Sequence, residues 1–389
     1  MSVENLSNDV SVQVIADLQR FSDLKSDWDR VCCGIPFRTF EWHYNWWRHF
    51  GSGRSLLILA VYDAKLCIGI APFFVERSLA VGRVVQFIGS GEVASDQQSI
   101  LSMPGRCDEV GTAVATWFAT RHGAGDAGPT NAHSDVDAGD LLELDGIDAT
   151  CPTLRAFVDK LEHLRFVVHD RSTVSTWRIP LPDSTDAYLA MLSKPCRRKV
   201  RTALKQFDAG GYAVSIADSE ATFENNWLNF THLHQRRRQS LGQPGCFANE
   251  AFARFLYDVA KQFHQAGFLD LVFISAAGRP IAAEICFRDR ASSFAYQIGI
   301  DPDTLDHSPG WLVNAASIRH AIDLGLSSFD LCRGDAEYKR QLGATPTVCK
   351  KLRIVPPRLR SQFLNTAMTT GAAMKHWCQD MFSGATTRS

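Results

Sequence analysis

The sequence contains no Cys-x-x-Cys pair and no run of 18 apolar residues. Its 11 cysteines are scattered, and only Cys32 and Cys33 adjoin. An odd number of cysteines without metal-ligand spacing is typical of reduced thiols in a cytosolic protein. The lack of a long apolar run predicts no transmembrane helix, and the polar start predicts no signal peptide. We therefore expect a cytoplasmic protein without a bound metal.

An excess of charge of either sign is also missing. Forty-one basic side chains face 42 acidic ones, which gives a formal net charge of −1. A global basic field of the kind that attracts nucleic acid or anionic membranes is thus absent, and no nucleic-acid partner is expected. No G-x-S-x-G motif is present, and no histidine stands in a recognisable setting, so nothing supports Ser/His/Asp nucleophilic catalysis.

The sequence has two informative features: enough apolar residues for a large core, and a weak internal repeat. The chain has 389 residues, 45% of them hydrophobic, which suits two or three domains. Strand–turn–strand patterns occur over 56–75 and 268–287, and they match at an offset of 213 residues. Two similar α/β halves from an ancient duplication are predicted. We expect boundaries at 1–182 and 183–356, with an amphipathic helical tail over 357–389.

The most informative stretch runs from Ser308 to Leu342 and predicts a helix, a short strand and a polar loop. Ser308 is placed to cap the helix through its hydroxyl, and Pro309 suits the first helical position. Gly310 would let a ligand approach the backbone closely. Such a helix start can hold a phosphate. It can also be an ordinary capped surface helix, and the residues alone leave both interpretations open.

Ser-Pro-Gly opening a helix, followed by the motifs Phe-Asp, Gly-Asp and Tyr-Lys in FDLCRGDAEYKRQLG, resembles GNAT-related acyltransferases of the CelD/BcsL type. These are distant cousins of the FemAB-type aminoacyl transferases. The resemblance extends loosely over residues 10–355, and it rests on the composite pattern rather than on any single piece. It implies two tandem GNAT-like folds of mixed α/β sheets. It also implies an acyl-CoA donor and transfer to an amine or hydroxyl of a small molecule or saccharide precursor.

The resemblance also suggests where donor and acceptor would bind. The donor would lie on the helix start and along the preceding strand, at Ser308, Gly310, Tyr296 and Gln297. Tyr338 and Lys339, from the Tyr-Lys motif, would relay a proton and neutralise developing charge. Residues expected to contact the acceptor are Asp96, Arg237 and Arg333, and Asp96 could equally be a solvent-facing loop residue.

Two carboxylates are candidates for the general base. Glu284 lies on a predicted strand on which Ile281, Ala283, Ile285 and Phe287 face the other way. Partial burial would raise the pKa of Glu284 toward a useful value. Glu284 could equally be an edge residue paired with Arg288, and Asp335 is the rival base.

Three other segments keep more than one interpretation. The loop from Gln86 to Gly91 fits a dinucleotide fingerprint and a GNAT phosphate loop, but no helix follows directly, so a simple glycine turn competes with both. Five basic residues within 197–205 form either a solvated helix face or a phosphate-binding surface. The aromatic residues within 40–47 belong to a core or to a groove wall.

The activity has two alternatives: an aminoacyl-tRNA-dependent transferase of the FemAB type, and a non-catalytic binding module. The sequence is compatible with a monomer or a homodimer.

Overall fold

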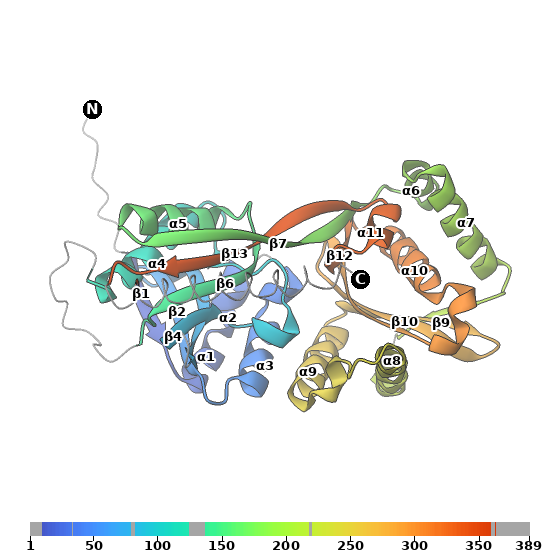
Figure 1. Ribbon diagram of the computed structural model, residues 1–389, viewed down its shortest axis with the longest axis horizontal. Coiled ribbons are helices and arrows are strands. Elements are labelled where there is room, and N and C mark those ends of the chain that lie inside the picture. Colours follow the sequence, from blue (N-terminus) through green and yellow to red (C-terminus); the bar gives the residue numbers. More distant parts are fainter. Residues whose placement is uncertain are drawn as a thin grey trace, which may run out of the picture.

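The computed structural model describes residues 10–32, 34–78, 82–123, 137–217, 220–358 and 362. The tail helix expected over 357–389 falls almost entirely outside these residues. The described chain forms two halves side by side (Figure 1), called here the first half (β1 to β7) and the second half (α6 to β13).

The first half contains seven strands and five α-helices among the described residues. The strands are β1 (Val10–Ile15), β2 (Ser55–Asp63), β3 (Leu66–Ser78), β4 (Gly82–Phe87), β5 (Leu101–Ser102), β6 (Leu141–Asp148) and β7 (Val167–Pro180). The helices are α1 (Leu18–Asp23), α2 (Lys25–Val31), α3 (Phe40–Phe50), α4 (Cys107–Arg121) and α5 (Pro152–His163).

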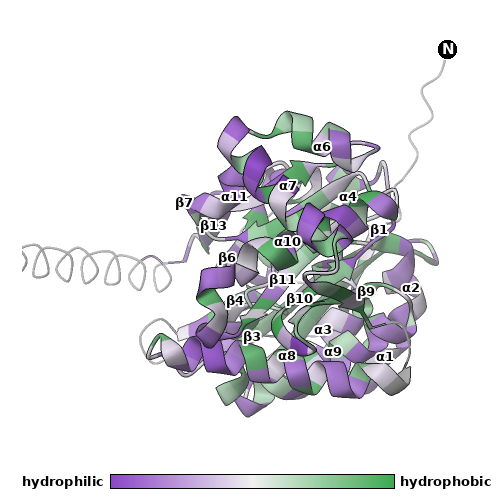
Figure 2. Cartoon of the chain, turned by 90° about the vertical axis from the view of Figure 1, so that its right-hand side faces the viewer, coloured by the Kyte–Doolittle hydropathy of each residue, from purple (hydrophilic) through white to green (hydrophobic). Residues whose placement is uncertain are grey.

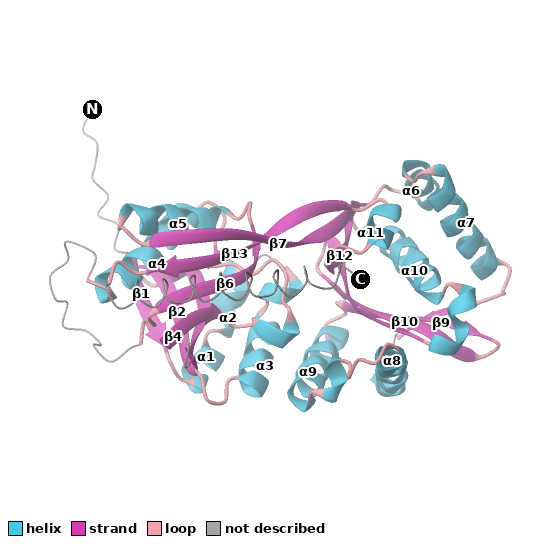
Figure 3. Cartoon of the chain, viewed as in Figure 1, coloured by secondary structure: helices cyan, strands magenta, loops and turns pink. Residues whose placement is uncertain are grey.

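The second half repeats this order after two additional helices, α6 (Thr185–Met191) and α7 (Lys194–Asp208). Its strands are β8 (Ala213–Ile216), β9 (Leu269–Ala276), β10 (Arg279–Arg288), β11 (Ser292–Ile300), β12 (Ser328–Arg333) and β13 (Thr345–Val355). Its other helices are α8 (Glu220–Ser240), α9 (Glu250–Gln265), α10 (Pro309–Asp323) and α11 (Glu337–Gln341). Helices cover both faces of the strands in each half (Figure 3).

The strands form one mixed sheet in the order β1-β2-β3-β4-β6-β13-β7-β12-β11-β10-β9-β8. The antiparallel run β1-β2-β3-β4 of the first half matches β8-β9-β10-β11 of the second half. Each run is followed by a parallel neighbour, β6 beside β4 and β12 beside β11. The predicted pair of hairpins is therefore confirmed at equivalent places, as β2–β3 and β9–β10. The fold is mixed α/β and consists of two GNAT-like folds.

The halves exchange their last strands. β7 of the first half pairs with β12 of the second half, whereas β13 of the second half pairs with β6 of the first half. β7 and β13 also pair with each other from Val167–Val355 to Arg178–Thr345, and they cross between the halves in Figure 1. The boundaries expected from the sequence assign residues 345–355 to the second half, but they do not reveal that this strand pairs with β6 of the first half. Strand periodicity reports which face is buried but not which strand lies alongside.

The halves also share one hydrophobic core. Helix α3 of the first half packs against α9 of the second half, and the ring of Trp42 meets that of Phe255 edge-on at 5.1 Å. Trp42 is fully buried and Trp46 nearly so, and both belong to a core cluster that includes Phe287 of β10. The aromatic segment over 40–47 is therefore packing, as one of its two interpretations predicted.

Local details differ from the sequence expectation at two places. The polar loop after β12 contains a short helix, α11. Ser308 adopts a left-handed conformation (φ 53°, ψ 50°), and its hydroxyl makes no capping hydrogen bond to α10. An N-cap serine that caps through its hydroxyl normally has extended backbone angles. Ser308 does not have them, so the capping expected from the sequence does not occur.

Candidate functional site

The parallel strands β11 and β12 stay paired only over Ser292 to Phe294. A bulge in β11 follows, since Cys286 of β10 faces Ala295 whereas Ile285 faces Gln297, which leaves Tyr296 as the extra residue. A bulge bends its strand and increases the local twist. Beyond it, β11 continues along β10 to Ile300, while β12 pairs with β7. The two strands therefore separate.

A pocket of about 330 Å³ opens at the end of β11, beside the start of α10. Its wall is mostly apolar and includes Ser308, Gly310 and Tyr338, three residues selected from the sequence. The remaining lining residues are Ile298, Ile300, Leu305, Pro309, Trp311, Asn314 and Leu342. A Cβ atom on Gly310 would lie 3.3 Å from Ile300 Cδ1, so this glycine keeps the pocket wall clear. An apolar pocket at a helix N-terminus suits a ligand with an anionic group and a long uncharged arm.

Glu284 lies beneath α10 and is 3% exposed. Asn314 Oδ1 on α10 has no hydrogen-bond partner among the described residues. Burial raises the pKa of Glu284 to about 7. The side chains of Ser317 on α10 and Cys286 on β10 lie beside the Glu284 carboxyl and partly oppose the rise in its pKa. The alternative that Glu284 is an edge residue paired with Arg288 is wrong, because Glu284 is buried and Arg288 pairs with Asp270. Ile281 was expected on the face of β10 opposite to Glu284, together with Ala283. It packs instead in the same core cluster as Ala282, because the strand register shifts between Pro280 and Ala282.

The charged loop after β12 is held by its own side chains. Lys339 is 4% exposed, and its Nζ donates to the carbonyl oxygens of Cys332 (2.9 Å) and Arg333 (2.8 Å). Burial lowers the pKa of Lys339. Asp335 is exposed, and its Oδ1 accepts from Ser175 N and Trp177 Nε1 of β7, each at 3.2 Å. These contacts fix the loop against the exchanged strand.

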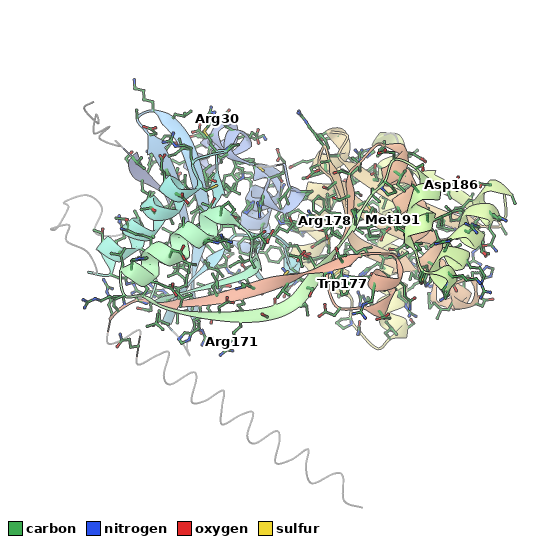
Figure 4. All side chains as sticks on the ribbon, turned by 90° about the horizontal axis from the view of Figure 1, so that it is seen from above. Arg30, Arg171, Trp177, Arg178, Asp186 and Met191 are labelled. Atoms are coloured by element: carbon green, nitrogen blue, oxygen red, sulfur yellow. The ribbon has the colours of Figure 1, made fainter. Side chains whose placement is uncertain are left out.

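Asp96 and Arg333, expected to bind the acceptor, bind each other across the junction of the halves. Arg333 Nε lies 2.5 Å from Asp96 Oδ1, and Arg333 N lies 2.9 Å from Asp96 Oδ2. Asp96 is 2% exposed, and burial raises its pKa, against the opposing effect of Arg333. Beside this pair, Gln97 Nε2 donates to Asp330 Oδ2 at 3.0 Å. Arg178 of β7 also reaches Asp330, and Figure 4 labels it where β7 crosses between the halves.

The glycine loop of the first half leads into this junction. The chain after Gly91 runs beside β6, where Gln98 N bonds Gly146 O at 2.9 Å. In the first half, the chain itself therefore lies beside β6 where β4 and β6 are no longer paired. The equivalent position in the second half is where β11 and β12 separate. Val93 O accepts from the hydroxyl of Tyr296 at 2.7 Å, which ties the loop to the bulge in β11.

The other side of the bulge meets α8. His234 is 1% exposed, and burial lowers its pKa to about 4. Its Nε2 lies 3.7 Å from Cys246 Sγ, and its ring also neighbours Gln297. Burial raises the pKa of Cys246 to about 12, so this thiol is not an activated nucleophile. Arg237 lies on the last turns of α8 and is half-buried.

The structure thus brings Ser308, Gly310 and Tyr338 together at the pocket and places Asp96 with Arg333 at the junction. It adds Asn314 and Ser317, which the sequence analysis missed. Both are polar residues on a helix face that otherwise carries apolar side chains, and this was the available signal. Among the described residues, no group of three or more His, Cys, Asp or Glu side chains could hold a metal ion. The described helices are also too short or too polar to span a membrane.

Comparison with known proteins agrees with the geometry. Residues 194–340 match the family model described as "Acetyltransferase (GNAT) domain". This segment contains every lining residue of the pocket except Leu342, and it contains Glu284 and Lys339. It resembles a GNAT domain. No curated protein matches the chain.

Solved structures show the same fold across both halves. The crystal structure of FemX superimposes with a TM-score of 0.58 at 11% identity, covering 87% of this chain and 96% of that one. A conserved protein of unknown function from Bacteroides thetaiotaomicron gives a TM-score of 0.52 at 11% identity, covering 88% and 100%. At these identities the likeness concerns the fold alone.

Proposed function

We propose that the protein is a cytoplasmic acyltransferase of the GNAT type, similar to the CelD/BcsL group. It would move an acetyl or longer acyl group from CoA to an amine or hydroxyl of a small molecule or saccharide precursor. The observation that carries the proposal is the pocket at the start of α10, beside the bulge in β11 and within the segment that matches the GNAT family. The proposed units are residues 1–182, 183–356 and the tail over 357–389.

The donor would bind with its pyrophosphate at the first turn of α10, near Ser308 and Gly310. The left-handed Ser308 supports this placement, because its hydroxyl does not cap the N–H groups of that turn. The pantetheine arm would follow Ile300 and Ile298 toward Tyr296 and Gln297. An acyl thioester is already activated, so the protein has to hold it, remove a proton from the acceptor and polarise the carbonyl.

Glu284 is the proposed base, with Asp335 as its rival. A pKa of about 7 suits a group that must accept a proton near neutral pH. Tyr338 lines the pocket, and burial raises the pKa of its hydroxyl, with a smaller contribution from the charge of Glu284. Tyr338 would relay a proton between the pocket and Glu284. Lys339 would hold the exit of β12 in place and add positive charge near the acceptor. Asp96, Arg237 and Arg333 would shape the acceptor side.

A direct titration tests the proposal. Trp311 lines the pocket, so donor binding should change tryptophan fluorescence, and Trp311→Phe should abolish that change without abolishing binding measured by calorimetry. Acetyl-CoA and longer acyl-CoAs are expected to bind, with free adenosine as the negative control. Failure of every acyl-CoA to bind would reject the proposal in favour of a non-catalytic binding module. Binding of an aminoacyl-tRNA, but of no acyl-CoA, would favour the FemAB-type alternative.

A further inference from the structure

Helix α7 carries a row of positive charge beside the proposed donor pocket. Lys194, Arg198, Arg201 and Lys205 are exposed and follow one another at steps of four, three and four residues. Residues at such steps lie on one face of a helix, so these four form a straight stripe about 16 Å long. We call them the α7 stripe. The opposite face of α7 is apolar and buried in the second half. Figure 2, which faces this end of the molecule, shows α7 as largely hydrophilic.

The α7 stripe has no counter-charge within the described chain. None of its four side chains makes a hydrogen bond or ion pair with a described residue. The nearest acid along the helix, Asp208, is already paired with Arg319 of α10 at 3.1 Å. Like charges at i,i+4 destabilise a helix, and Lys194 in the first turn opposes the helix dipole, since that turn has no acidic residue. The stripe therefore costs stability, and helix formation does not explain it.

Helix α7, which carries the stripe, lies beside the pocket. Lys199 Nζ lies 5.1 Å from the ring centroid of Trp311, which lines the pocket. Eight residues further along both helices, Arg319 lies 5.4 Å from the ring of Phe207. The two helices thus run side by side in the same direction, so Arg198 lies level with the start of α10 and Lys194 lies about one turn before it. Met191, at the end of α6, is 50% exposed and lies three residues before Lys194 in the chain, so it offers an apolar surface near the start of the stripe (Figure 4 labels Met191).

We propose that the α7 stripe docks the acidic helix of a carrier protein that delivers the acyl group on a phosphopantetheine arm. This inference rests on the proposed function, because the arm would enter the same pocket as the pantetheine of CoA. The phosphates of CoA would gather at the start of α10, whereas the stripe continues along α7. A straight row of four cations on a helix complements a row of carboxylates on another helix, and Met191 supplies an apolar contact at its edge. The balanced net charge of the chain argues against nucleic acid, and the RNA probe below tests this alternative.

The experiment uses the full chain and four probes: acetyl-CoA, an acidic carrier protein bearing an acyl-phosphopantetheine arm, the same carrier without the arm, and an RNA hairpin. Binding is measured by calorimetry at low and high salt. The test variant is Arg198→Glu/Arg201→Glu, with Arg198→Gln/Arg201→Gln as a milder version. The matched control is Arg77→Glu/Arg290→Glu, which changes two exposed arginines without described side-chain partners elsewhere on the molecule. Thermal unfolding checks that each variant is folded.

We expect the loaded carrier to bind more tightly than the carrier without the arm, and more weakly at high salt. The Glu variant should weaken carrier binding at least tenfold and the Gln variant less. Acetyl-CoA binding should stay within threefold, and the control variant should change neither. Three results would overturn the inference: acetyl-CoA binds but the carrier does not, acetyl-CoA loses as much affinity as the carrier in the stripe variants, or only the RNA depends on the stripe. Failure of both acetyl-CoA and the carrier to bind the wild-type chain would instead reject the proposed function.

Discussion

Asp96 of the first half and Arg333 of the second half form a buried ion pair at the point where the two halves join. Two contacts hold the pair, since both the guanidinium and the backbone N–H of Arg333 donate to the Asp96 carboxylate. Arg333 also donates to Ser95 O at 2.5 Å. The pair therefore fixes the chain after the glycine loop of the first half to the exit of β12, next to the proposed site.

Removing one partner of this pair should destabilise the protein. Asp96→Ala leaves the guanidinium of Arg333 without its counter-charge, and we expect a loss of about 3 kcal/mol in the free energy of unfolding. The control is Asp29→Ala, because Asp29 is 53% exposed and its pair with Lys25 should contribute less than about 0.5 kcal/mol. Denaturant titration measures both. Equal losses in the two variants would show that the junction does not depend on the buried pair.

The placement of the donor predicts a graded effect at Gly310. Valine at this position would crowd Ile300 and the first turn of α10, so acyl-CoA affinity should fall at least tenfold, or about 1.4 kcal/mol. Alanine adds only a Cβ atom at 3.3 Å from Ile300 Cδ1, so Gly310→Ala should have a smaller effect. Calorimetry with acetyl-CoA gives the two values. An unchanged affinity in a folded Gly310→Val protein would move the donor elsewhere.

Glu284 predicts a dependence of stability on pH. Burial raises its pKa from 4.5 to about 7, so the folded protein holds this proton more tightly than the unfolded chain does. The contribution of Glu284 to stability is thus fully present below pH 4.5 and is lost as the pH rises through 7, by a total on the order of 3 kcal/mol. Glu284→Gln cannot ionise, so it should gain stability relative to wild type between pH 5 and pH 8.

The same variant separates a structural role from a catalytic one. If Glu284 is the base, wild-type kcat/KM should rise with pH to a plateau above about 7. The Glu284→Gln variant should not show this rise of kcat/KM with pH. Acyl transfer to a panel of amines and sugars, followed over pH 5–9, supplies the profile. A Glu284→Gln variant that keeps the full kcat/KM and its rise with pH would show that Glu284 is not the base and would favour Asp335.

Lys339→Met should affect both stability and transfer. Methionine keeps the apolar stem but leaves the carbonyls of Cys332 and Arg333 without their donor, so we expect a loss of about 2 kcal/mol in unfolding free energy. Because the β12 exit adjoins the proposed site, kcat/KM should fall by about 100-fold or more, roughly 2.7 kcal/mol, with acyl-CoA affinity within a factor of a few. Lys351→Met is the control, since Lys351 is 41% exposed. Full activity of the folded Lys339 variant would disprove the assignment.

Much of the local structure was predictable because it depends on neighbouring residues. The two hairpins follow from alternating apolar residues around turns, and the α10 helix from its apolar spacing and its closing Gly325. The repeat between 56–75 and 268–287 indicated two similar halves, and the sheet order bears this out. The start of α10, with Ser308 and Gly310, was identified for the same reason, since Ser-Pro-Gly is a contiguous signal.

The tertiary structure alone decided what depends on distant residues. The alternation in β13 would suit either half, and only the packed sheet places it between β6 and β7. Asp96 and Arg333 were both expected to contact the acceptor, because nothing near either one in sequence reveals a partner 237 residues away. The sequence by itself therefore determined the repeated hairpins, the helix start and the GNAT resemblance. Strand exchange, the buried ion pair and the pocket required long-range pairing, which residue periodicity does not encode.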